Sequence, residues 1–303
     1  MPAPASDLAT KLRLERKLSA RMRSLFGSIG RTLQNSLGTG VGSVSPSIAR
    51  VWQPVLVQIL VDHYATVAKT FARPIVAAMP SAVAPGEEER KALALALARV
   101  FGNRAEEQAK LVLETAERRV ARSVGRASMA IAAPGSGLTS ADLPRLAARD
   151  WVRRQVVQAR AVATYETQTA AETAKGVVVA RLSGHPSPVH KDVVGEPWKV
   201  WQTQGDSRVR GADGKGRFDH FDADGQRVPV SGSFEVSGER LRWPGDRSLG
   251  ASDGNVYGCR CTALYETDTV AELRALIGER LVADARRFLQ TASDVVVSLP
   301  FTL

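Results

Sequence analysis

Cysteine is scarce in this chain of 303 residues, which contains only Cys259 and Cys261. A pair two positions apart is not the spaced framework of a small secreted, disulfide-bonded domain. A bridge between the two would close a very tight ring, so we expect reduced thiols. Long apolar runs are also missing, since no stretch approaches the roughly 20 residues that a membrane-spanning helix needs. We therefore expect no stable insertion into a membrane.

The sequence also lacks the signatures of several common enzyme classes. It has no Gly-rich phosphate-binding loop, no nucleophile elbow and no zinc-protease helix motif. The start of the chain lacks the order of a secretory signal peptide, because basic residues follow Ser6 and no long apolar core appears. These absences favour a soluble, non-enzymatic protein that is made in the cytoplasm.

Composition indicates a folded, basic protein. Apolar residues make up 44% of the chain, which is enough for a hydrophobic core. Lysine and arginine number 41 against 31 acidic residues, which gives a net charge of +10. Such a surplus fits contact with nucleic acid, an anionic membrane surface or an acidic partner, and it does not choose among them.

The first part of the chain is predicted to be helical. From Leu8 to Leu37, apolar residues recur at helical spacing. A second amphipathic helix is expected over about 48–71, and carboxylates after Gly86 predict a long helix that ends near Ala132. The Gly-Ser stretch 134–137 then predicts a domain boundary.

Beyond that boundary we expect a helix from about Asp142 to Lys175, ended by Gly176, and then a change to short strands. The predicted fold class is α+β, with a helical basic region over 1–135, an α+β module over 136–268, and a C-terminal helix and apolar tail over 269–303. The strands are expected at Val177–Leu182, Trp198–Trp201, Gln226–Val230, Phe234–Val236 and Arg240–Trp243.

An ordered series of short motifs lies between Asp206 and Cys261. With Glu166 upstream, the series consists of Asp206, Arg208-Val-Arg210, His220, Asp224-Gly225, Pro244-Gly245-Asp246 and Cys259-Arg260-Cys261. This series resembles the phage Mu F-like family of minor head, or head morphogenesis, proteins, over roughly residues 140–266. The chain departs from the family pattern in an insertion at 211–219 and in Gly258, which replaces an Asn before the Cys-Arg-Cys motif.

The resemblance implies a virion protein rather than an enzyme. Its expected role is that of a minor capsid protein of a tailed phage or prophage, which acts in procapsid assembly in the host cytoplasm and stays in the phage head. The implied partners are the portal protein, capsid or scaffold proteins, and double-stranded DNA bound without sequence preference.

The motif residues allow more than one interpretation. In a strand, Arg208 and Arg210 would point to the same side and would need carboxylates or phosphates. They can form an internal ion-pair network or an exposed phosphate-binding stripe. The Asp-Gly and Pro-Gly-Asp motifs have the composition of structural turns. The carboxylates available for the network are Asp206, Asp224, Asp246 and Glu166.

A zinc site is an alternative to a protein without cofactors. Cys259, Cys261 and His220 can supply three zinc ligands, with His185 or His190 as a fourth. In the other interpretation, the two cysteines are small residues on one face of a strand and His220 pairs with a carboxylate such as Asp206 or Asp222.

The first predicted helix has one basic side. Its lysines and arginines can neutralise DNA phosphates, bind an acidic portal or scaffold surface, lie on a membrane surface, or simply remain solvated. No aromatic residues alternate with them, which argues against base stacking. The residues are Lys11, Arg13, Arg16, Lys17, Arg21 and Arg23.

Two other function classes remain open at this point. The first is a metal-dependent DNA-processing enzyme or toxin-like effector, and the second is a structural adaptor without DNA contact. The enzyme would be assembled from His185, His190, His220, Asp206 and Asn255.

Overall fold

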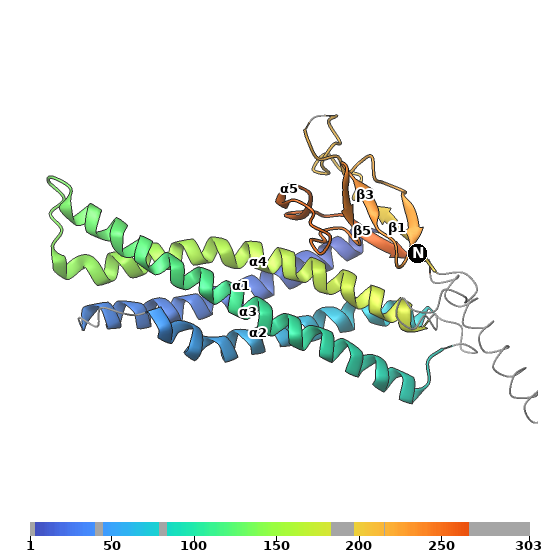
Figure 1. Ribbon diagram of the computed structural model, residues 1–303, viewed down its shortest axis with the longest axis horizontal. Coiled ribbons are helices and arrows are strands. Elements are labelled where there is room, and N and C mark those ends of the chain that lie inside the picture. Colours follow the sequence, from blue (N-terminus) through green and yellow to red (C-terminus); the bar gives the residue numbers. More distant parts are fainter. Residues whose placement is uncertain (1–3, 40–44, 79–83, 183–196, 215, 267–303) are drawn as a thin grey trace, which may run out of the picture.

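The computed structural model describes residues 4–39, 45–78, 84–182, 197–214 and 216–266. Four long helices form an elongated bundle, and a small strand-containing unit packs against one side of it (Figure 1). The α+β prediction is confirmed. The helices are α1 (Pro4–Gly38), α2 (Ser45–Ala77), α3 (Glu87–Ala132) and α4 (Leu143–Leu182).

The bundle core follows the apolar periodicity of α1. Leu14, Leu18, Met22, Phe26, Ile29 and Leu33 recur every three or four residues, and all are buried. α1 packs mainly on α4, and α2 packs on both α3 and α4. Trp151 of α4 lies at the centre, where its ring meets Phe26 edge-on at 6.0 Å between centroids. Its indole N–H donates a 2.8 Å hydrogen bond to the carbonyl of Ala116.

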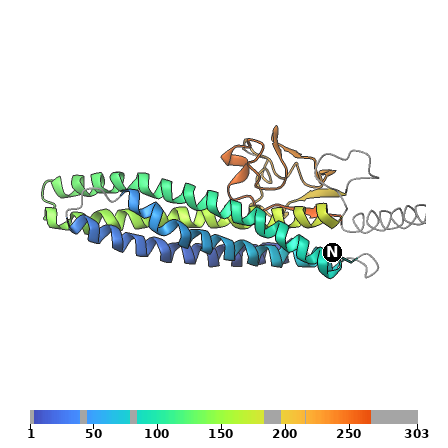
Figure 2. The same ribbon diagram turned by 60° about the horizontal axis from the view of Figure 1, so that its bottom comes forward.

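α3 and α4 form a hairpin whose turn lies at the end of the bundle remote from the strands (Figures 1 and 2). Thr139 and Asp142 form a capping box at the start of the short helix η2 (Ser140–Asp142), which leads into α4. The boundary expected between residues 135 and 136 falls in this turn. The boundary does not separate α4 from the other three helices, because side chains of α4 lie in the same hydrophobic core as theirs.

α4 continues to Leu182, so the helix end expected at Gly176 and the strand expected at Val177–Leu182 are wrong. Val178, Val179 and Leu182 are buried under the strand-containing unit, and this tertiary packing outweighs their β propensity. Gly176 serves a close approach instead, because a Cβ there would lie 3.2 Å from the hydroxyl of Tyr265.

The strands form two small antiparallel sheets. β1 (Trp198–Gln202) is the central strand of the order β2-β1-β5, flanked by β2 (Arg227–Pro229) and β5 (Thr262–Tyr265). A hairpin of β3 (Phe234–Val236) and β4 (Glu239–Leu241) forms the second sheet. The strands expected around β1 to β4 are confirmed, β3 with the expected ends and the other three with shifted ends.

The short helix α5 (Asp253–Val256) precedes β5. The C-terminal helix and apolar tail expected over 269–303 lie outside the described residues. Among the residues that are described, no helix has both the length and the apolar character needed to cross a membrane.

Candidate functional site

Three of the proposed metal ligands meet in the interior of the strand-containing unit. His220 Nδ1 lies 3.5 Å from Cys259 Sγ and 3.7 Å from Cys261 Sγ. The three side chains are buried, with exposed fractions of 1%, 7% and 2%, and their ligand atoms all lie within 4.8 Å of one another. This group can hold a metal ion.

Backbone contacts and ring packing place these side chains. The His220 N–H donates to the carbonyl of Arg210 at 2.9 Å, which holds the loop against the turn before it. The His220 ring meets Trp201 of β1 edge-on at 5.6 Å. Cys261 directly precedes β5, which pairs with β1, so the sheet register brings the cysteines beneath the imidazole.

Asn255 fixes which nitrogen of His220 carries the proton. The Asn255 amide nitrogen donates to Val236 O at 3.0 Å and to Glu239 Oε2 at 2.8 Å, so its oxygen must face His220. That oxygen lies 3.0 Å from His220 Nε2, closer than the guanidinium Nη1 of Arg210 at 3.4 Å, so the shorter contact assigns the proton to Nε2 as a donor. The lone pair of Nδ1 is left facing the two sulfur atoms, as a metal ligand requires.

The surroundings of Cys259 and Cys261 shift the pKa values of the two thiols in opposite directions. A hydrogen bond from Cys261 is the largest cause that lowers the pKa of Cys259, and burial acts against it. The hydrogen bond with Cys259 and burial raise the pKa of Cys261. Of the two thiols, Cys259 therefore loses its proton more readily, and the thiolate is the form that binds metals. The carboxylate partners considered for His220, Asp206 and Asp222, make no hydrogen bond to it among the described contacts.

The expectation that Arg208 and Arg210 lie in a strand is wrong, because both lie in turns. Gly211, with φ of +85°, bends the chain directly after them. Arg208 is exposed and lies 3.5 Å from Asp206. The Arg210 guanidinium instead donates to the carbonyls of Asn255 and Tyr257.

Arg260 takes the place that was expected for Arg210 in the ion-pair network. Its Nη2 lies 2.5 Å from Asp206 Oδ2, which joins the first and last motifs of the series. Its Nε and Nη1 are buried without a hydrogen-bond partner among the described residues.

The Asp-Gly and Pro-Gly-Asp motifs build turns. Asp224 Oδ1 accepts a 2.7 Å hydrogen bond from the backbone N–H of Thr203, and Gly225 adopts φ of +78°. Asp246 accepts from the backbone N–H groups of Arg242 and Ser248 at 2.9 and 2.8 Å. The carbonyl of Pro244 accepts from Gln168 of α4, and Gly245 lets α4 approach, since a Cβ there would lie 3.0 Å from Gln168.

Glu166 lies in the bundle and has partners that the motif series does not contain. It is buried, and its two oxygens accept from Arg104 Nε at 2.8 Å and Nη2 at 3.1 Å. The Tyr64 hydroxyl also donates to it at 2.5 Å. Glu166 therefore joins α2, α3 and α4 and pairs with neither Arg208 nor Arg210.

The basic side of α1 is smaller than the sequence indicates. Lys11 is buried, and its Nζ donates to Glu172 Oε1 at 3.1 Å and to Thr262 Oγ1 at 3.4 Å. Arg21 forms an ion pair with Asp62 at 2.8 Å. A helical repeat places Lys11 on the side of α1 that faces α4, which a list of charges does not reveal. The positions that remain exposed without a described ion pair are Arg13, Arg16, Lys17 and Arg23.

His185 and His190 lie outside the described residues. Asn255 was considered above only as part of an enzyme. Its closeness in sequence to the Cys-Arg-Cys motif was the only sequence feature that pointed to it, and its orienting role depends on contacts with β3 and β4.

Comparisons of the chain with protein-family models, curated protein sequences and solved structures give no match.

Proposed function

We propose that this chain is a minor capsid protein of a tailed phage or prophage, which bridges the portal or shell and the packaged DNA during assembly of the head. The proposal is carried by the motif series between Asp206 and Cys261, which lies in one small unit and several of whose members contact one another. Arg260 binds Asp206, and His220 contacts both cysteines. These contacts support a shared structural purpose for the series.

The bundle supplies the reach that a bridging protein needs. α3 has 46 residues and α4 has 40, so the hairpin extends about 60 Å at the usual rise of 1.5 Å per residue. The strand-containing unit packs near one end of this rod, and the hairpin turn lies at the other (Figure 2). Two binding partners can therefore be held at separate ends.

For the exposed basic side of α1 we propose an acidic surface of the portal or scaffold as the partner. Arg13 and Arg16 are exposed, and Leu12 beside them is 38% exposed, so this side offers positive charge and one apolar side chain to such a surface. The Arg13→Glu, Arg16→Glu variant should weaken this association and leave the helical circular dichroism unchanged.

The test of the proposal is co-purification of the full chain with the portal protein of the same phage or prophage, at low and high salt. Stable co-elution that Arg13→Glu, Arg16→Glu weakens is the expected result. Replacing Arg50 and Arg73, which are exposed on α2, by Glu is the matched control. No association at either salt concentration would contradict the portal-bridging role and favour a protein that only contacts DNA.

For the metal site, we propose zinc in a structural role. Tetrahedral zinc with bonds of about 2.3 Å to sulfur and 2.0–2.1 Å to nitrogen places an N···S pair about 3.6 Å apart. The two observed N···S distances, 3.5 and 3.7 Å, fit this geometry. Burial of all three side chains favours a structural over a catalytic site, and a structural tetrahedral site would take a fourth ligand beside these three. Bound zinc would supply a cross-link between the His220 loop and the start of β5.

Zinc content of the purified full chain tests this assignment. We expect stoichiometric zinc, and cobalt substitution should give the intense near-ultraviolet absorption of thiolate-to-cobalt charge transfer. The Cys259→Ser, Cys261→Ser variant should lose both signals. A wild-type protein that takes up neither metal would rule out the zinc site and favour the cofactor-free interpretation.

The second candidate function is a metal-dependent DNA-processing enzyme or toxin-like effector, and the His-Cys-Cys group is the observation that favours it. Incubation of supercoiled plasmid with the zinc-loaded chain tests it. Cleavage that His220→Ala abolishes would support the enzyme and contradict a purely structural zinc site.

A further inference from the structure

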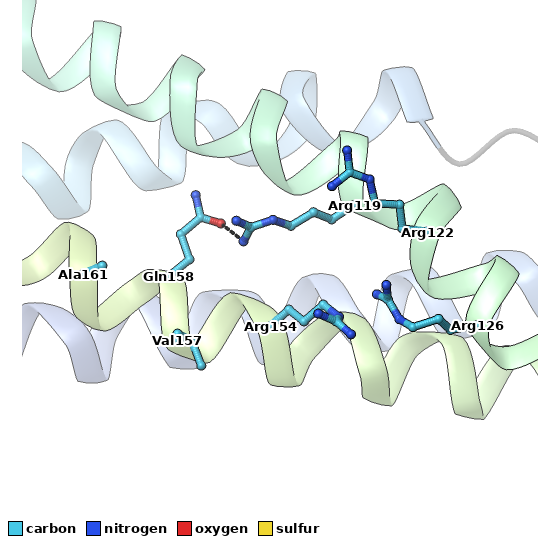
Figure 3. A pocket seen from close by; sticks show the side chains of 7 residues that line it. All are labelled: Arg119, Arg122, Arg126, Arg154, Val157, Gln158 and Ala161. Atoms are coloured by element: carbon cyan, nitrogen blue, oxygen red, sulfur yellow. Dashed lines mark hydrogen bonds between the residues drawn. The ribbon is translucent and has the colours of Figure 1, made fainter. Parts of the chain in front are cut away.

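Four arginines line an open pocket between α3 and α4, away from the strand-containing unit. The pocket has a volume of about 510 Å³. Figure 3 shows that Arg119 and Arg126 extend from α3, and Arg154 from α4, into the space between the two helices, and that Arg122 lies beside Arg119 on α3. The remaining lining residues are Val157, Gln158 and Ala161.

The helical repeat explains why these arginines gather. Arg119, Arg122 and Arg126 are spaced by three and four residues, so they share one face of α3 over about 10 Å. Trp151 of α4 faces α3, since its indole N–H donates to the carbonyl of Ala116. Arg154 follows Trp151 by about one turn and therefore also lies on the side of α4 that faces α3. The hairpin thus holds the four side chains on rigid elements.

The positive charge of the pocket is only partly neutralised. Asp150 accepts from Arg126 Nη2 at 2.6 Å and from Arg154 Nε at 3.3 Å. Burial opposes ionisation of Asp150, but hydrogen bonds from Arg126, Ser123 and Arg154 lower its pKa to about 2, so it stays ionised. One carboxylate therefore serves two of the four guanidinium groups.

Arg119 and Arg122 are left without a carboxylate. Arg119 donates to the neutral amide oxygen of Gln158 at 2.7 Å. Arg122 is exposed, and within the described part of the chain it has no hydrogen bond or ion pair. Burial and the charges of Arg122 and Arg154 lower the pKa of Arg119. Bound anions would relieve this repulsion.

We infer that this pocket binds the phosphate backbone of double-stranded DNA, and that Arg119 and Arg122 make the contacts. The inference rests on the proposed head function and assigns its DNA contact to α3 and α4 instead of α1. Guanidinium forks match phosphate oxygens in a bidentate manner. The lining contains no aromatic residue to stack on bases, so the binding is independent of sequence.

Charge on the surrounding surface is consistent with an extended polyanion. Arg118 and Arg153 are also exposed on α3 and α4, close in sequence to the pocket residues. Duplex DNA carries a charge about every 1.7 Å along its axis, so a rod-like hairpin can contact several phosphates at once. A short acidic peptide would engage only the pocket itself.

Fluorescence anisotropy of the full chain with a labelled 30-base-pair duplex, over a range of salt concentrations, tests the inference. The Arg119→Ala, Arg122→Ala variant should bind about tenfold more weakly, with a salt slope smaller by about two, at all duplex sequences. The matched control is Arg50→Ala, Arg73→Ala on α2, which removes the same charge and should bind like wild type.

Equal binding by the pocket variant and the wild type, or no binding by either, would overturn the inference. Polyglutamate that displaces the duplex as well as unlabelled DNA does, charge for charge, would also overturn it in favour of an acidic protein. Portal co-purification separates the two proposals. DNA binding that depends on Arg119 and Arg122, without portal association, would support the DNA-binding pocket and contradict the bridging role.

Discussion

Lys11 and Glu172 form a buried ion pair, with 3.1 Å between Nζ and Oε1, although they are 161 positions apart in the sequence. Glu172 also pairs with Lys175 at 2.9 Å and accepts from the Thr262 hydroxyl at 3.0 Å. Its other oxygen accepts from the backbone N–H of Ala263 at 3.3 Å. This carboxylate therefore connects α1 and α4 of the bundle with β5 of the strand-containing unit.

Replacing Glu172 with Gln should destabilise the fold strongly. The substitution keeps the shape but leaves Lys11 and Lys175 buried without their carboxylate, and breaking a buried pair costs about 3–5 kcal/mol. Urea unfolding should show this loss. Asp62→Asn, which breaks the exposed pair with Arg21, is the control and should cost about 1 kcal/mol or less. Similar losses for the two variants would contradict a special role for Glu172.

Stability should fall as His63 becomes protonated. Burial and the charge of Arg21 lower the pKa of His63 to about 4 from an ordinary 6.5. The unfolded chain therefore binds more protons between these values, so the contribution is present above about pH 6.5 and is lost as the pH falls to about 4. The full loss is about 3 kcal/mol.

Urea unfolding between pH 4.5 and 7 measures the His63 effect. His63→Gln can still reach Thr167, the present hydrogen-bond partner of the imidazole at 2.9 Å, and it does not titrate. Its stability should depend less on pH than that of wild type over this range. A variant with the same pH dependence as wild type would place the titrating group elsewhere.

Metal affinity should depend on Asn255, which makes no contact with a sulfur atom among the described interactions. Asn255→Ala removes the acceptor for His220 Nε2–H and lets the imidazole adopt the other tautomer. Loss of such an orienting partner weakens metal binding by about 10–100-fold. Competition for zinc with a chromophoric chelator measures the change. Asn103→Ala, at an exposed position of α3, should retain wild-type affinity, and equal affinity in both variants would refute the orienting role.

Two glycines of α1 should respond in opposite ways to alanine. Gly27 has space, since its nearest neighbour would lie 4.0 Å from an added Cβ, so Gly27→Ala should stabilise by up to about 1 kcal/mol. At Gly30 the Cβ would lie 2.3 Å from Val152 Cγ2, and Gly30→Ala should destabilise by about 1–3 kcal/mol. Thermal unfolding of the two variants provides the comparison. Stabilisation by both would mean that α1 and α4 pack less closely.

Much of the bundle could be predicted from sequence because helical periodicity is a local property. The buried face of α1 and the start of α3 at Glu87 follow from residues within a few turns. The sequence also allowed His220, Cys259 and Cys261 to be proposed as one set, since histidine and cysteine side chains are common zinc ligands. The spacing alone did not show that β5 would bring them together.

The sequence by itself determined the helix faces, the turn residues and the types of side chain that can hold a metal, because each depends on neighbours along the chain or on side-chain chemistry. The tertiary structure decided which charges are available. It buried Lys11 against Glu172, joined Arg260 to Asp206, and gathered Arg119 and Arg154 around one pocket. Charges attract or repel according to distance and burial, and residues more than 30 positions apart acquire both only when helices and strands pack.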